Sequence, residues 1–138
     1  MNIAVRYFTR SGNTKKLAEA VAGAAGVSAK DVSVPLDSRM DVLFLCSSVY
    51  AAGVDGAVAE FLKSNAKNIG MIVNVSTAAV LSSTYGQVKK LADECGIKIS
   101  EEEFHCRGSF LFMHRGHPDD RDLQNAANFT LNILKNIL

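Results

Sequence analysis

The sequence predicts an α/β fold in which one open, doubly wound sheet of five parallel strands carries helices on both faces. Apolar runs alternate along the chain with stretches whose apolar residues recur every three or four positions, as expected when strands alternate with helices. The runs at residues 42–46 and 69–75 are almost continuously apolar, which strands buried on both faces require. With 138 residues, 48% of them hydrophobic, the chain can bury one core, and we expect a single domain over residues 1–138.

The first half of the chain is expected to contain three strands and two helices. The strands are predicted at residues 3–8, around Val32 and Val34, and at residues 42–46; the helices are predicted at residues 13–25 and 55–66. Pro35 places the second strand at an edge of the sheet, because proline cannot donate a hydrogen bond to a neighbouring strand.

The second half is expected to add a strand at residues 69–75, a helix at 84–95 that ends at Gly96, a fifth strand at 104–110 and a helix at 118–138. Pro118 suits the first turn of the last helix. The core face of that helix is predicted to carry Leu123, Ala127, Leu131 and Leu134. The fifth strand is predicted to turn Phe104, Cys106, Gly108 and Phe110 to one side and His105, Arg107 and Ser109 to the other.

Charge and composition exclude several classes of protein. The 15 basic residues are scattered and matched by 14 acidic ones, so the chain lacks the basic stripe of a nucleic-acid binder. Its apolar runs are far shorter than the roughly 18 residues of a membrane span, and no signal peptide is visible. The three cysteines, Cys46, Cys95 and Cys106, form no C-x-x-C pair. We therefore expect a cytoplasmic protein with no membrane span and no nucleic-acid partner.

Hydroxyl side chains gather around one glycine between the first strand and the first helix, in residues 9–14. A phosphate placed there would meet the backbone N–H groups and the positive end of the helix dipole. Gly12 would let the backbone approach closely, and Arg10 could add positive charge. An ordinary helix cap by Ser11 or Asn13 explains the same residues, so both interpretations remain open on this segment alone.

Two further loops are expected at the same edge of the sheet, because the carboxyl ends of parallel strands lie together. The loop at residues 47–53 contains small residues and Tyr50, whose ring offers a stacking surface. The loop at residues 76–86 brings more hydroxyls and Tyr85. The three loops together predict a phosphate cradle beside a site for a planar ligand. The motifs of dinucleotide and nucleoside triphosphate sites, G-x-G-x-x-G and G-x-x-x-x-G-K-[ST], are absent, which favours a phosphate monoester.

The chain resembles the flavodoxin family over nearly its whole length, and the run TRSGNT is similar to that family's FMN-phosphate loop, T-x-[TS]-G-N-T. Flavodoxin is itself a known example of the strand order 2-1-3-4-5, with FMN at the point where the order reverses. The resemblance implies the same order here, with FMN as cofactor. The implied phosphate loop comprises Thr9, Arg10, Ser11, Gly12, Asn13 and Thr14. The implied ring-binding residues are Ser48, Val49, Tyr50, Ala51, Gly53, Ser76, Thr77 and Ala78.

The resemblance implies an electron carrier that works with redox partner proteins, either reductases or ferredoxin-type proteins. The family also implies a peptide beside the flavin that can flip, with Gly53 or the Ala51–Ala52 link as the candidate. Carriers of this family are usually strongly acidic near the flavin, whereas this chain has a formal charge of +1 and has no Trp to flank the ring. The segments FHCRGSF and RGHPDDRDLQNA are similar to a subgroup of small bacterial flavodoxin-like proteins.

Two other functions remain as alternatives. One is an FMN-dependent reductase or oxidase that acts on a quinone or another small molecule. The other is a response-regulator-type signalling module, which needs an acidic residue after the third strand; the chain has Cys46-Ser47-Ser48 there.

Neither a metal site nor a set of catalytic residues is expected. His105, Cys106, His114 and His117 fit no standard zinc spacing, and we expect Cys106 to pack as a small apolar residue. The acids at residues 101–103 and 119–120 are explained by a solvated bend and by the positive end of a helix.

Overall fold

The computed structural model describes residues 1–9, 12–48, 56–78, 83–107 and 118–137, apart from the side chains of Ala78 and Arg107. The strands are β1 (Ile3–Tyr7), β2 (Ala29–Asp31), β3 (Val42–Ser48), β4 (Met71–Ala78), β5 (Lys98–Ile99) and β6 (Phe104–Arg107). The helices are α1 (Asn13–Ala25), α2 (Gly56–Asn65), the short 3₁₀ helix η1 (Ala66–Asn68), α3 (Tyr85–Cys95) and α4 (Asp120–Ile137). None of the helices in the described part of the chain combines the length and apolar character that a membrane crossing needs.

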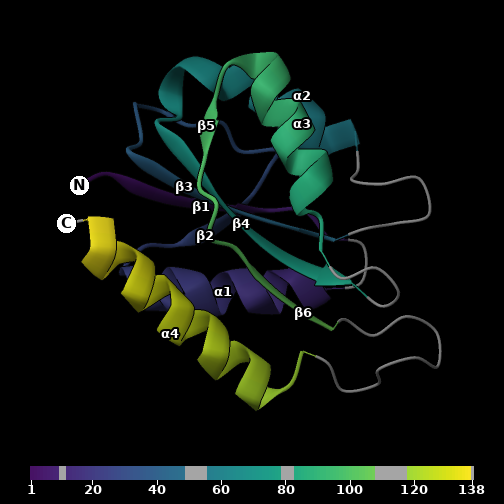
Figure 1. Ribbon diagram of the computed structural model, residues 1–138, viewed down its shortest axis with the longest axis vertical. Coiled ribbons are helices and arrows are strands. Elements are labelled where there is room, and N and C mark those ends of the chain that lie inside the picture. The colour runs from purple at the N-terminus through teal and green to yellow at the C-terminus, as the bar shows by residue number, and fades with distance from the viewer. Residues whose placement is uncertain (10–11, 49–55, 79–82, 108–117, 138) are drawn as a thin grey trace.

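The strands pair in parallel in the order β2-β1-β3-β4-β5, and β6 pairs with β4 beyond β5. The predicted fold class and strand order are thereby confirmed. In Figure 1, α1 and α4 lie on one side of the sheet, and α2 and α3 lie on the other. The carboxyl ends of β1, β3 and β4 point the same way, because the two ladders that join these strands are both parallel.

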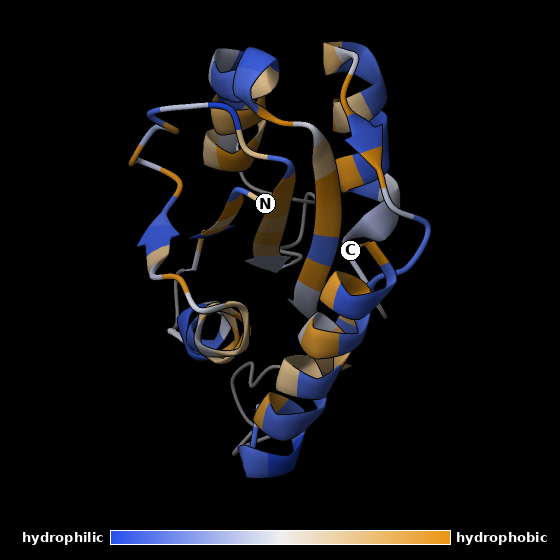
Figure 2. Ribbon diagram, turned by 90° about the vertical axis from the view of Figure 1, so that its left-hand side faces the viewer, coloured by the Kyte–Doolittle hydropathy of each residue, from blue (hydrophilic) through white to orange (hydrophobic). Residues whose placement is uncertain are grey.

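Alternation along the strands divides the core into two layers. Val5, Phe44 and Val75 pack with residues of α1 and α4, whereas Leu43 and Ile72 pack with residues of α2 and α3. Successive side chains of a strand point to opposite faces, so a strand covered on both sides is apolar throughout. In Figure 2 the central strands are mostly orange, whereas the helices carry both orange and blue residues.

The segment that crosses from β2 to β3 contains no helix and is held by two buried polar side chains. The Arg6 guanidinium donates to the carbonyl oxygens of Val34 and Pro35 at 2.9 and 3.2 Å. Asn65 accepts a hydrogen bond from the Leu36 N–H at 2.9 Å. Burial lowers the pKa of Arg6, and the nearby charge of Asp37 acts against that shift. Side chains thus form the hydrogen bonds to backbone carbonyl and N–H groups that a crossover helix would have formed within itself.

Two sequence predictions of the strands need correction. The edge strand lies at β2, slightly before its predicted place, and Val34 is 38% exposed. The fifth strand is split, since β5 and β6 both pair with β4 and a bend separates them. Within β6, Phe104 and Cys106 pack against the core of α1 and α4, as predicted. Residues 108–110 lie outside the described part of the chain.

The predicted core face of α4 is wrong at Leu131, which is 53% exposed. The fully buried positions are Ala126, Thr130 and Ile133. Thr130 is polar in the sequence, yet its hydroxyl donates to the Ala126 carbonyl at 2.9 Å, so the side chain can be buried without an unsatisfied group. The buried stripe is therefore rotated relative to the one that apolar residues alone predict.

Candidate functional site

The order of the strands reverses between β1 and β3, since β1 leads to β2 on one side of the sheet and the later strands follow on the other. Tyr7 is paired with Cys46, and the N–H of Phe8 donates to the Cys46 carbonyl at 3.1 Å. In open α/β sheets, ligands bind beyond the carboxyl ends of the strands at such a point. This edge is therefore where a ligand is expected.

Helix α1 begins at this edge with a turn that depends on Gly12. Gly12 has a left-handed backbone, with φ 88°, and its N–H donates to Thr9 Oγ1 at 2.9 Å. The Gly12 carbonyl accepts the first helical hydrogen bond, from the N–H of Lys16 at 3.2 Å. A glycine cannot cap the helix with a side chain, and the first turn of α1 contains no acidic residue. The positive end of the α1 dipole therefore faces no carboxylate from its own first turn, and an anion is favoured there.

A hydroxyl cluster of Thr14, Ser48 and Thr77 joins the start of α1 to the ends of β3 and β4. Thr14 Oγ1 lies 2.9 Å from Ser48 Oγ and 3.1 Å from Thr77 Oγ1. Thr14 and Thr77 are buried, and Ser48 is half-buried. These three residues are far apart in the sequence, and the pairing of Ser48 with Thr77 in the sheet brings them together. All three are among the predicted site residues.

A second polar cluster lies on the opposite face of the same strands, where Thr84 is surrounded by Ser47, Asn74 and Ser76. Thr84 Oγ1 is 3.1 Å from Ser47 Oγ and 3.0 Å from Asn74 Nδ2, and the N–H of Thr84 donates to Ser76 Oγ at 3.3 Å. All four side chains are buried. The sequence prediction included Ser76 but missed Asn74. The signal was a lone amide within the apolar run at residues 69–75, because a buried amide needs partners.

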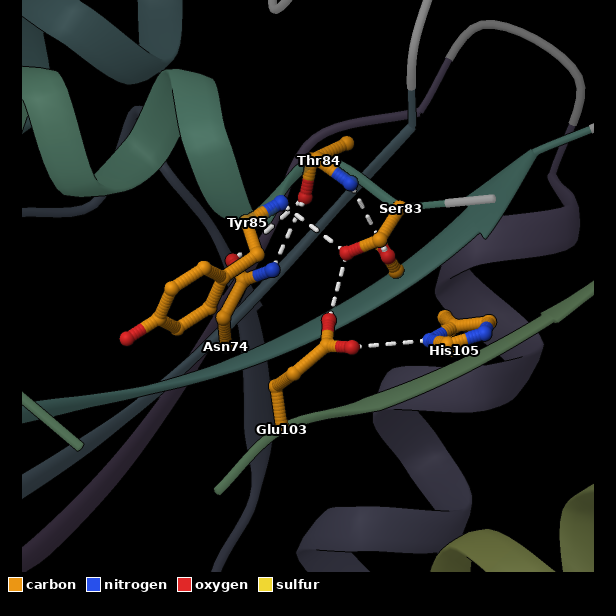
Figure 3. A network of polar contacts seen from close by, with 7 residues as sticks. Asn74, Ser83, Thr84, Tyr85, Glu103 and His105 are labelled. Carbon is orange, nitrogen blue, oxygen red and sulfur yellow. Dashed lines mark hydrogen bonds and ion pairs between the residues drawn. The ribbon is translucent and has the colours of Figure 1, made fainter. Parts of the chain in front are cut away.

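Beyond Thr84, a partly exposed network connects α3 to β6 (Figure 3). Ser83 Oγ accepts the N–H of Tyr85 at 2.9 Å and donates to Glu103 Oε1. Glu103 Oε2 lies 2.8 Å from His105 Nδ1. A carboxylate only accepts hydrogen bonds, so the bonded ring nitrogen of His105 carries a proton. The sequence prediction assigned Glu103 to a solvated bend, but its side chain is only 18% exposed.

The structure describes only some of the predicted site residues. Gly12, Thr14, Ser48 and Thr77 lie together, as set out above, with Asn13 as the first residue of α1. Thr9 meets Gly12, Ser76 faces Thr84 rather than Thr14, and Ala78 ends β4. The predicted residues Arg10, Ser11, Val49, Tyr50, Ala51 and Gly53 lie outside the described part of the chain.

Neither thiol close to this edge is suited to act as a nucleophile. Burial raises the pKa of Cys46 well above its ordinary range. Burial also raises the pKa of Cys106 to about 12, with smaller contributions from the charges of Asp122 and Asp119. A thiol acts as a nucleophile only once it is deprotonated. Cys106 packs against the core of α1 and α4, as predicted.

A groove of about 510 Å³ lies beside the site, between the end of β1 and α2. Phe8, Pro35 and Phe61 supply apolar lining. Its charged lining residues in the described chain are the acids Asp31 and Glu60. Carboxylates repel a phosphate, so the groove is a poorer place for an anion than the start of α1.

Comparison with solved structures identifies the fold. A flavodoxin from the domain Archaea is 18% identical, with a TM-score of 0.77 over 99% of each chain. Oxidised Flavodoxin 1 from Bacillus cereus is 16% identical, with a TM-score of 0.74 over 98% of each chain. A flavodiiron core from Synechocystis is 14% identical, with a TM-score of 0.71, and the match covers the whole of this chain but 37% of that one. No protein-family model matches the chain, and no curated protein sequence matches it either. Whole-length superposition, a parallel sheet ordered 2-1-3-4-5 and a loop of the TRSGNT type together establish a short-chain protein of flavodoxin-like fold.

Proposed function

We propose that this protein binds FMN and transfers electrons between redox partner proteins. The observation that carries the proposal is the junction of β1 and α1, where a left-handed Gly12 opens the helix beside the hydroxyl cluster of Thr14, Ser48 and Thr77. This junction joins the three strand ends at which a flavin would be held. Likeness in fold and length to proteins named flavodoxins supports the same proposal.

The phosphate of FMN is assigned to the segment of residues 9–14. Its members are Thr9, Arg10, Ser11, Gly12, Asn13 and Thr14. The described residues fit a phosphate monoester, because α1 begins at the left-handed Gly12 with no acidic residue in its first turn, so the positive end of its dipole favours an anion. Lys15 and Lys16 are exposed in the first turn of α1 and add positive charge.

The flavin ring is assigned to the ends of β3 and β4 and the residues that follow them. The proposed ring-binding residues are Ser48, Val49, Tyr50, Ala51, Gly53, Ser76, Thr77 and Ala78. When bound, FMN supplies one- and two-electron redox chemistry, and the role of these residues is to hold and orient it. The redox partners are proposed to be reductases or ferredoxin-type proteins. All three cysteines are free, which suits a reducing compartment such as the cytoplasm.

Paired titrations with FMN and riboflavin test the proposal. The two ligands share the ring, but riboflavin lacks the phosphate. We expect FMN fluorescence to be quenched at micromolar protein concentration or below, and riboflavin to bind more weakly because it cannot use residues 9–14. Absence of quenching and of flavin absorbance in the purified protein would refute the cofactor assignment. Steady NAD(P)H–quinone turnover by the FMN-loaded protein would instead favour an oxidoreductase that acts on small molecules.

A further inference from the structure

Helix α3 begins without the usual devices that stabilise a helix start. Its N-cap residue is Thr84, whose side chain makes no capping hydrogen bond because its hydroxyl points inward to Asn74 and Ser47. The first turn of α3 contains no acidic residue. An uncapped start leaves backbone N–H groups and a positive dipole end to be satisfied from elsewhere.

Ser83 and Glu103 supply that missing stabilisation from two different segments. The hydroxyl of Ser83 accepts a hydrogen bond from the N–H of Tyr85, the first residue of α3, and donates one to the Glu103 carboxylate. Glu103 belongs to the bend before β6, twenty residues further along the chain. Its negative charge therefore lies close to the positive end of α3, where a carboxylate is favourable.

His105 holds the same carboxylate from β6. Its Nδ1 lies 2.8 Å from Glu103 Oε2, so both oxygens of the carboxylate have a partner. The Glu103 side chain is 18% exposed and the His105 side chain 46% exposed. A hydrogen bond to a mostly buried carboxylate is strong, and loss of either partner leaves an uncompensated group.

This network adjoins the part of the proposed site at the end of β4. His105 is paired with Ser76 in the sheet, and Ser76 Oγ accepts the N–H of Thr84. Cys106 is likewise paired with Thr77. The buried Thr84 cluster thus holds the start of α3 against β3 and β4. Among the side chains drawn in Figure 3, Glu103 is the one that links the start of α3 to β6, through His105.

We propose that Glu103 is a positioning residue for the flavin ring, an inference that rests on the proposed function. By joining Ser83 to His105, it sets the position of the amino end of α3 relative to β6 and so maintains the shape of the site beside Ser76 and Thr77. Glu103 acts through Ser83, whereas residues 9–14 are proposed to hold the phosphate. Loss of Glu103 therefore weakens FMN and riboflavin by the same factor.

The test compares Glu103→Ala with Glu102→Ala, a control that removes an exposed acid from the same bend. We expect Glu103→Ala to weaken both FMN and riboflavin about fivefold or more, the factor that corresponds to an interaction of about 1 kcal/mol. Glu102→Ala leaves both affinities unchanged. Glu103→Gln recovers part of the loss, since its amide can still accept from Ser83 and donate to the other tautomer of His105.

Two measurements separate this role from general loss of stability. In the double variant Ser83→Ala/Glu103→Ala, the loss of affinity is smaller than the product of the two single losses, because both changes break the Ser83–Glu103 contact, although Ser83→Ala also removes the acceptor of the Tyr85 N–H. Hydrogen exchange without any ligand is faster in the first turn of α3 in Glu103→Ala than in Glu102→Ala, while urea unfolding shows that both variants are folded at the assay temperature.

The outcomes distinguish the two proposals. If the unaltered protein binds FMN and Glu103→Ala binds it as Glu102→Ala does, the positioning role is overturned and the proposed function stands. A loss confined to FMN, with riboflavin unaffected, also overturns it, because Glu103 would then act on the phosphate. If the unaltered protein does not bind FMN, both proposals fail, and hydrogen exchange reports only on the helix.

Discussion

Substitution of alanine for Gly12, just before α1, and for Gly23, inside α1, is expected to have opposite effects on stability. Gly12 precedes α1 with φ 88°, and a Cβ built there would meet nothing within 4 Å. The penalty of Gly12→Ala is therefore backbone strain alone, about 1 to 2 kcal/mol for a left-handed alanine. Gly23 lies inside α1, and a Cβ there also meets nothing within 4 Å. Gly23→Ala is expected to stabilise the protein by about 0.5 to 1 kcal/mol.

Urea unfolding measures the difference, which should be about 1.5 to 3 kcal/mol between the two variants. Equal m values are required, so that the midpoints report stability rather than a changed unfolded state. In flavin titrations, Gly12→Ala should weaken FMN and spare riboflavin, and Gly23→Ala should affect neither. If Gly12→Ala is as stable as Gly23→Ala, the fold does not impose the left-handed turn. If Gly12→Ala retains full FMN affinity, the assignment of the phosphate to this turn is wrong.

Three further predictions concern buried polar groups and thiols. Thr14→Val removes a hydroxyl with two buried or half-buried partners and should lower the free energy of unfolding by about 1 to 3 kcal/mol; an unchanged urea midpoint would contradict this. Arg6→Met leaves two carbonyls of the β2–β3 crossover without a donor and also removes a buried charge, and the net effect should lower the free energy of unfolding by about 1 to 3 kcal/mol. Equal or greater stability in urea unfolding would contradict this. Burial raises the pKa of Cys46 and Cys106, so their thiols stay protonated in the folded state while the unfolded state ionises above about pH 8.5. The free energy of unfolding that the protonated thiols contribute is therefore complete below that pH and falls above it, by at most about 1.4 kcal/mol per pH unit for each thiol. In urea unfolding at increasing pH, the double alanine variant should lose stability less steeply.

Periodicity predicted those parts of the fold in which local sequence and burial agree. Helix α1 has the predicted bounds, residues 13–25, and α3 ends at Gly96 in a left-handed turn, as expected. The buried strands β3 and β4 were predicted from apolar runs, because the sheet is covered on both faces. The TRSGNT run pointed to the turn at Gly12, since its glycine and hydroxyls report on local backbone geometry.

Features that depend on distant segments were not predictable in the same way. The sequence does not predict that the last strand is divided into β5 and β6, because β5 has only two residues, Lys98–Ile99, and is too short to show an alternating pattern. On α4, Leu131 is exposed and Thr130 is buried. Burial of Thr130 is tolerated because its hydroxyl donates to the Ala126 carbonyl, which removes the cost of burying an unpaired polar group. The sequence predicts a solvated acid at Glu103, because its partner Ser83 is twenty residues away in the chain.

The sequence by itself determined the order and type of most elements, the parallel sheet and the glycine turn at the start of α1. Those features follow from the spacing of neighbouring residues, which is already present in the linear chain. Only the tertiary structure decided that Thr14 meets Ser48 and Thr77, and that a carboxylate of the β6 side stabilises the start of α3. Strand register and helix rotation bring those groups within hydrogen-bonding distance, and both are set by packing between segments that are remote in sequence.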